Sequence, residues 1–160
     1  MASNRHLGRI IALQTLYELE FRREAGDKSA KLAEILDRNI ARYNAVIEDQ
    51  DFIKRLVQGV LDKEKELDDT LQPIAPEWPV AQIARMDRIV LHLGLYELMH
   101  DQEIPPKVVI NEAVELAKSF GGDNSSKFIN GVLGTALRNQ QPELKLDKTD
   151  TDKEAKHEAA

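Results

Sequence analysis

The sequence of 160 residues contains no cysteine. It therefore has no disulfide framework, no thiolate metal ligand and no cysteine nucleophile, which favours a reducing cytoplasm as its compartment. No apolar run approaches the ~20 residues that a membrane-spanning helix needs. The first nine residues also lack the apolar stretch of a signal peptide. We expect a cytoplasmic protein that does not enter a membrane.

Motifs of common catalytic sites are missing as well. The sequence holds no glycine-rich phosphate loop with its lysine and no Gly-x-Ser-x-Gly segment. Glu97 and His100 form a Glu-x-x-His pair, but di-metal helical bundles need two such pairs. Because nothing assembles a nucleophile, a base and an orienting group, we predict no enzymatic activity, no metal site and no cofactor.

The chain is acidic, with a formal net charge of −6. Phosphate binding depends on basic side chains, so an acidic chain is a poor general binder of nucleic acid. Residues 1–17 differ, because they contain Arg5, His6 and Arg9 and no acid. A nucleic-acid site in this protein must therefore be local, or be shared with a basic partner.

Apolar residues recur at helical spacing along most of the chain, and no segment reads as a strand. The first helix is expected to begin near Ser3 or Asn4, to carry an apolar stripe from Leu7 to Phe21, and to end at Gly26. Further helices are expected after a cap at Ser29 and over the ranges 52–71, 80–99, 108–120 and 125–137, with a break near 84–88 left open.

Three prolines divide this helical pattern. Pro73, Pro76 and Pro79 make residues 72–79 a link, because proline disrupts helix interiors. We predict an all-α protein of two packed helical bundles, over residues 1–72 and 80–139. Residues 140–160 are polar and lack periodicity, which predicts a disordered tail.

The start of the last helix has the chemistry of an anion site. Ser125 or Asn124 is expected to cap it, and a helix N-terminus offers free backbone N–H groups. Lys127 adds a positive charge, and Phe128 lies off the apolar stripe, where a base could stack. A plain capped helix with a peripheral core phenylalanine fits equally, just as a solvated helix start fits Arg5 and Arg9. Farther along, Gly131 and Gly134 are predicted to let another helix approach closely.

Four parts of the sequence carry a specific pattern: RIIALQTLY at 9–17, Trp78, MDRIVLHLGLYEL at 86–98, and IPPKVVINEAVELAKSFGGDNSSKFINGVLG at 104–134. Together they resemble the NusB family of transcription antitermination factors. The resemblance covers about residues 4–138. It implies an all-α fold of about seven helices in two bundles that lie side by side, and it implies no catalysis.

The resemblance also implies partners. Proteins of this family pair with NusE, a small-subunit ribosomal protein, and the pair binds the boxA element of nascent RNA. The complex joins elongating RNA polymerase, suppresses premature termination in ribosomal RNA operons and aids rRNA maturation. An interaction module of the same fold that does not use RNA is the alternative. The sequence leaves the oligomeric state open, a homodimer included.

Family positions near RNA can be transferred to this sequence one by one. The arginine-rich opening helix of the family corresponds to the segment of Arg5, His6 and Arg9, although Leu7 and Gly8 interrupt the arginine run here. Many relatives carry an acid where this chain has Asn124, and losing that charge favours RNA binding. The residues that the resemblance implies for RNA binding are Arg5, His6, Arg9, Gln14, Tyr17, Asp87, Asn124, Lys127 and Phe128.

Overall fold

The computed structural model describes residues 2–43, 47–75, 79–101 and 103–140. Every regular element in these ranges is a helix, which confirms the predicted all-α class. None of these helices combines the length and the apolar character that crossing a bilayer requires. The elements are α1 (Ala2–Glu24), α2 (Leu32–Ala41), α3 (Gln50–Asp62), α4 (Glu64–Leu71), the short 3-10 helix η1 (Val80–Gln82), α5 (Arg85–His100), α6 (Pro106–Phe120) and α7 (Ser125–Gln140).

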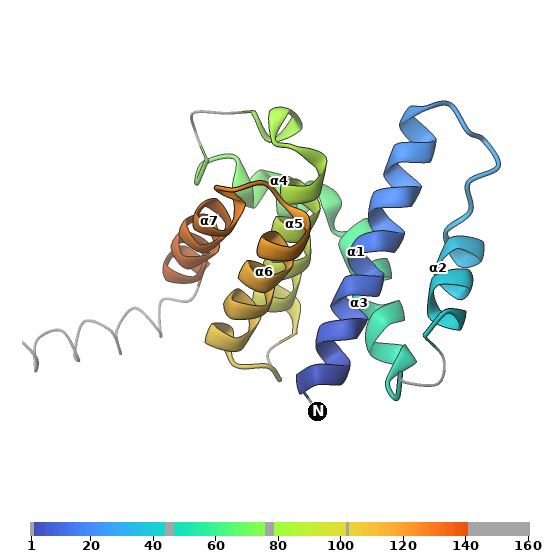
Figure 1. Ribbon diagram of the computed structural model, residues 1–160. Coiled ribbons are helices and arrows are strands. Elements are labelled where there is room, and N and C mark those ends of the chain that lie inside the picture. Colours follow the sequence, from blue (N-terminus) through green and yellow to red (C-terminus); the bar gives the residue numbers. More distant parts are fainter. Residues whose placement is uncertain (1, 44–46, 76–78, 102, 141–160) are drawn as a thin grey trace, which may run out of the picture.

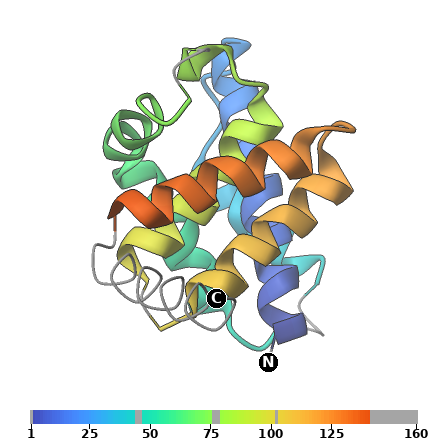
Figure 2. The ribbon, with the colours of Figure 1, turned by 90° about the vertical axis from the view of Figure 1, so that its left-hand side faces the viewer.

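Two groups of helices lie side by side (Figure 1). α1 packs against α2 and α3, α5 packs against α6 and α7, and α4 contacts helices of both groups. Viewed from the side of α7, this helix crosses over α5 and α6 (Figure 2). Residues 76–78 of the expected link, Trp78 among them, and residues 141–160 of the expected tail lie outside the described ranges.

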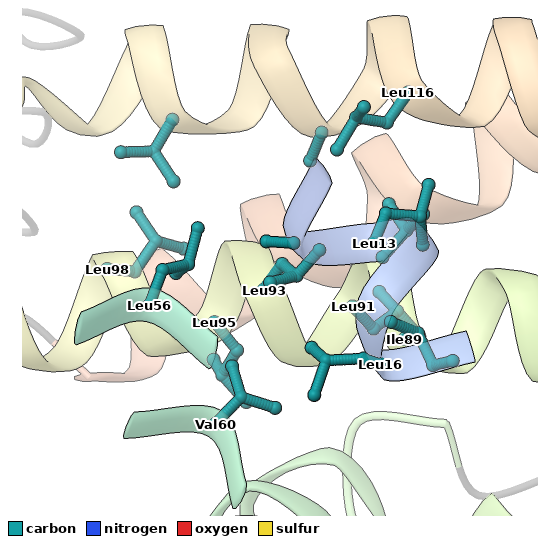
Figure 3. Packing of buried hydrophobic residues seen from close by; sticks show 14 of the residues in the cluster. Leu13, Leu16, Leu56, Val60, Ile89, Leu91, Leu93, Leu95, Leu98 and Leu116 are labelled. Carbon is teal, nitrogen blue, oxygen red and sulfur yellow. The ribbon is translucent and has the colours of Figure 1, made fainter. Parts of the chain in front are cut away.

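One hydrophobic cluster runs through both groups. Leu13 and Leu16 of α1 meet residues of α3 and α5, and Leu116 of α6 closes the cluster on its other side (Figure 3). Helix α5 is buried along most of its length, from Ile89 to Leu98. At ~25 cal/mol for each Å² of buried apolar surface, this shared cluster stabilises the position of the two groups relative to each other.

Helix boundaries follow local chemistry in most places. Gly26 has φ +83°, and the N–H of Asp27 donates to the carbonyl of Arg22, so α1 ends in a left-handed glycine cap as expected. The Asp49 carboxylate caps α3 by accepting from the N–H of Phe52 at 3.0 Å. Ser29 does not cap α2, which begins two residues after Ala30; its hydroxyl donates to Asp27 instead.

The expected helix over 52–71 is in fact two. α3 ends at Asp62 and α4 starts at Glu64, because Lys63 leaves helical geometry with φ −108° and ψ 12°. Glu64 and Glu66 then occupy the first turn of α4, where negative charge is favourable. Near 84–88 the open break is present: η1 ends at Gln82 and α5 starts at Arg85.

The expected role of two glycines is wrong. A Cβ atom on Gly131 would meet nothing within 4 Å, and one on Gly134 would meet only the end of the Arg138 side chain, at 3.6 Å. Close contacts between helices lie at two other glycines instead. A Cβ on Gly59 of α3 would stand 2.1 Å from Tyr96 Cζ, and one on Gly94 of α5 would stand 2.7 Å from Leu133 Cδ1 and 3.4 Å from the Cβ of Ala113. Glycine at position 94 lets α7 and α6 pack onto α5, and glycine at position 59 makes room for the Tyr96 ring.

Candidate nucleic-acid interface

The first turns of α1 hold the three basic residues expected to meet RNA, and Arg9 is not on the surface. Its Nε donates to Glu97 Oε2 at 2.9 Å and its Nη2 donates to Glu97 Oε1 at 2.8 Å. The side chains of Arg9 and Glu97 are 3% and 2% exposed. The structure therefore does not place Arg9 at the surface where the phosphate contact was expected, because its guanidinium is paired with a buried carboxylate.

Arg5 and His6 remain at the surface beside this buried pair. His6 Nδ1 lies 2.5 Å from Glu112 Oε2 of α6, and Arg9 Nη1 lies 3.8 Å from the same oxygen. Arg5 keeps 30% of its side chain exposed; its Nη2 is 3.9 Å from Asp49 Oδ2 and its Cζ lies 4.8 Å from the centre of the Phe52 ring. Arg5 is the arginine at this end of α1 that can still reach a phosphate.

Farther along α1, Tyr17 lies next to the first turn of α5. Arg85 Cζ is 5.4 Å from the centre of the Tyr17 ring. Burial opposes the charge of Arg85, but hydrogen bonding with Tyr17 and the carboxylates of Glu24 and Glu20 hold the pKa of its guanidinium above the ordinary value. Gln14, one turn before Tyr17, is half-buried.

Asp87 lies in the first turn of α5, where a carboxylate suits the helix dipole. Its Oδ1 is buried and has no hydrogen-bond partner among the residues that the structure describes. A buried carboxylate oxygen without a donor is costly. This oxygen is enclosed in the structure, so only the remainder of the half-buried Asp87 side chain faces the surface at the start of α5.

The start of α7 presents the third set of candidates. Asn124 and Lys127 are exposed, whereas Phe128 is half-buried and packs against the core cluster. The loop before the helix is held by Ser125, whose buried hydroxyl accepts from the N–H of Gly122 at 2.9 Å. This serine thus fixes the loop, and the N–H of Phe128 bonds to the Asn124 carbonyl at 3.2 Å.

The structure thus gathers the candidates at three helix starts and along α1. Arg5, His6 and Arg9 meet around Glu112 and Phe52, and Tyr17 meets the start of α5. α5 packs against both α1 and α7 (Figures 1 and 2). In the part of the chain that the structure describes, no hydrogen bond or ion pair joins Lys127 or Asn124 to α1, and no three acidic or histidine side chains converge as metal ligands.

Comparison with known proteins identifies the family. The sequence matches the NusB family over residues 6–138. The chain belongs to the NusB family. The transcription antitermination protein NusB of Chloroflexus aggregans is 44% identical over 139 residues, which cover 86% of this chain and 89% of that protein. The family relationship makes the chain a transcription antitermination factor.

Solved structures support the same fold. The structure of NusB from T. maritima matches with a TM-score of 0.77 at 29% identity, covering 89% of this chain and 96% of the other. A structure of the antitermination factors NusB and NusE in complex with dsRNA matches with a TM-score of 0.73 at 22% identity, covering 87% and 99% of the two chains. Both confirm the two helical groups as the NusB fold.

Two residues near Tyr17 were not expected at the surface site of this NusB-family chain. Phe21 was placed in the apolar stripe of α1, but it is 54% exposed. Arg85 was not among the candidate residues, although it lies over the rings of both Tyr17 and Phe21. The polar residue Gln14 was the signal in the sequence that could have predicted the exposure of Phe21. Residues 14, 17 and 21 share a helix face, and a polar residue on that face indicates that it lies at the edge of the core.

Proposed function

We propose that this chain binds the boxA element of nascent ribosomal RNA together with NusE. In the cytoplasm the complex joins elongating RNA polymerase and supports transcription and maturation of rRNA. One observation carries the proposal: an acidic chain keeps a partly exposed arginine, Arg5, at the start of α1 and an exposed lysine, Lys127, at the start of α7, and the rings of Tyr17 and Phe128 are only half-buried. The structure of a related NusB and NusE with dsRNA gives it further support.

Each candidate has a distinct task in this proposal. Arg5 and Lys127 contact phosphates, because Arg5 is a partly exposed and Lys127 an exposed cation. Such contacts fix the register of the RNA. Tyr17 and Phe128 offer ring faces to unpaired bases. The hydrogen-bonding side chains that read base edges or riboses are His6, Gln14, Asp87 and Asn124.

Arg9 acts from the interior. By joining α1 to Glu97 of α5 and approaching Glu112 of α6, it holds the first turns of α1 against the second group of helices. Arg5 and His6 lie on those turns. Arg9 is therefore a positioning residue for the RNA surface rather than a contact.

NusE is needed because the chain offers few cations. Arg5 and Lys127 can neutralise about two phosphates, and the affinity for RNA rises with the number neutralised. A basic partner supplies the remaining charge to a protein with a net charge of −6. We expect weak RNA binding by the chain alone and a marked gain with NusE.

Fluorescence anisotropy of labelled RNA tests the proposal. Wild-type chain is titrated into boxA RNA and a scrambled RNA of the same composition, with and without NusE, over a range of salt concentrations. We expect boxA to be preferred in the presence of NusE. Lys127→Ala should weaken binding to both RNAs and reduce the salt slope by about 1, whereas Lys65→Ala, which removes a 92% exposed lysine from α4, should leave both unchanged.

Two results would contradict the proposal. One is equal affinity for boxA and scrambled RNA when NusE is present. The other is tight binding of NusE, or a stable homodimer, with no RNA binding under any salt condition. That second result would favour the interaction module that works without RNA.

A further inference from the structure

Phe21 is an aromatic side chain on α1 that the fold leaves largely uncovered. It is 54% exposed, more than any other large hydrophobic residue in the described part of the chain. It follows Tyr17 by four residues, so the two rings lie on one face of α1. Phe21 is not among the residues packed against the core cluster, so more than half of its side chain is accessible to a ligand.

Arg85 joins the two rings from the neighbouring helix. Its Cζ lies 5.4 Å from the centre of the Tyr17 ring and 5.4 Å from the centre of the Phe21 ring, within cation–π range of both. Glu24 and Glu20 pair with the guanidinium from α1 and hold it in place. Resting on the function proposed above, we infer that Tyr17, Phe21 and Arg85 form a stacking platform for one unpaired RNA base beside the boxA contacts.

The charges around the platform favour a base over a phosphate. Arg85 is paired with Glu24 and Glu20, and Arg88 is paired with Glu20, so no positive charge is left over. A phosphate at this position would meet two carboxylates. A base, by contrast, offers a neutral flat face that stacks on rings and on a guanidinium plane.

The surroundings also favour RNA over a protein partner. The core of a protein interface is depleted in charged residues, whereas Phe21 is bordered by Glu20, Glu24 and Arg85. The platform shares Tyr17 with the proposed RNA surface. Asp87, which is half-buried and one of the residues of the proposed RNA surface, follows Arg85 by two residues. The platform therefore continues one RNA surface along α1.

A series of RNA lengths tests the platform in the full-length chain with NusE present. The RNAs carry boxA alone or boxA with one to four unpaired nucleotides added at either end. Wild type should bind one extended set more tightly than boxA alone, by roughly fivefold or more, since one stacked base contributes ~1–3 kcal/mol. Because the platform carries no surplus charge, this gain should persist at high salt.

Variants of Phe21 identify the ring as the cause. Phe21→Ala and Phe21→Leu should both lose the gain from the extension while binding boxA alone as wild type does. Phe21→Trp should keep or increase the gain, because its ring is larger. The melting temperature should stay the same in all three, since the side chain is mostly exposed.

The outcomes separate this inference from the function on which it rests. If wild type does not prefer boxA to scrambled RNA, the proposed function and the platform both fail. If boxA is preferred but no extension helps, or if Phe21→Leu keeps the gain, the platform alone is overturned. Loss of NusE affinity in Phe21→Ala with an unchanged gain from the extension would also overturn it, and would assign Phe21 to a protein interface.

Discussion

The two ends of α1 use the same kinds of side chain in opposite ways. Near the N-terminus, Arg9 turns inward and forms a buried bidentate pair with Glu97. Near the C-terminus, Arg22 turns outward and pairs with Glu18 at 3.1 Å and Asp27 at 2.8 Å in a solvent-exposed cluster. The difference teaches that the facing helix decides the role of an arginine, since α5 covers only the first of these positions with a carboxylate.

The largest effect is expected at the buried end. Arg9→Ala leaves the Glu97 carboxylate buried without its partner, which typically costs about 3–5 kcal/mol of stability. Urea denaturation of wild type and variant measures this loss. The double variant Arg9→Met with Glu97→Leu should recover much of it, because an apolar pair of similar volume carries no desolvation cost.

The matched control for this prediction lies at the exposed end of the same helix. Arg22→Ala removes ion pairs at the surface, which contribute little to stability because solvent screens them. If Arg9→Ala costs no more than Arg22→Ala, the contrast between the two ends is wrong. Arg9→Ala should also weaken RNA binding, but only in proportion to the fraction of protein molecules in which α1 is unfolded or displaced.

Two phenylalanines sharpen the comparison between buried and exposed positions. Phe128 is half-buried against the core, whereas Phe21 is mostly exposed. Phe128→Ala should therefore cost about 1–2 kcal/mol of stability, a part of the value for full burial, and also about 1–3 kcal/mol of RNA affinity. Melting temperature and RNA anisotropy on the same variant measure both. An unchanged affinity with a lowered melting temperature would leave Phe128 a core residue only.

Arg5 lies at the same end of α1 as Arg9, but its side chain is partly exposed to solvent. Its long contact of 3.9 Å with Asp49 leaves the guanidinium accessible, so Arg5→Ala should change stability by less than about 1 kcal/mol. RNA affinity should fall for all sequences alike, and the salt slope should drop by about 1. Arg55→Ala, which removes an exposed arginine from α3, serves as the control. A loss confined to boxA would show that Arg5 reads bases and does not only contact phosphates.

Local signals predicted much of this fold. The glycine that ends α1 was expected from the sequence, because a glycine cap acts through atoms within a few residues and the sequence contains the whole signal. The residues that were placed wrongly depend on distant partners. Arg9 is buried because Glu97 faces it from 88 positions away, and the close approach occurs at Gly94 because Leu133 packs there. No periodicity in α1 or α7 contains that information.

The smallest expected effect is on stability at low pH, and it comes from Asp27 at the C-terminal end of α1. Hydrogen bonds from Ser29 and Arg22 lower the pKa of Asp27 from 3.8 to about 2. A carboxyl group with a depressed pKa in the folded state adds stability above its unfolded pKa, and this contribution is lost as the pH falls from 3.8 toward 2. Melting temperatures measured between pH 5 and pH 2 should therefore decline less steeply for Asp27→Asn than for wild type across this window. Asp69→Asn is the control. Asp69 is exposed, and its ion pair with Lys65 is a long one, with 3.9 Å between Asp69 Oδ2 and Lys65 Nζ. If the melting temperatures of Asp27→Asn and wild type fall equally steeply with decreasing pH, then the Arg22 and Ser29 contacts do not hold the C-terminal end of α1 in solution.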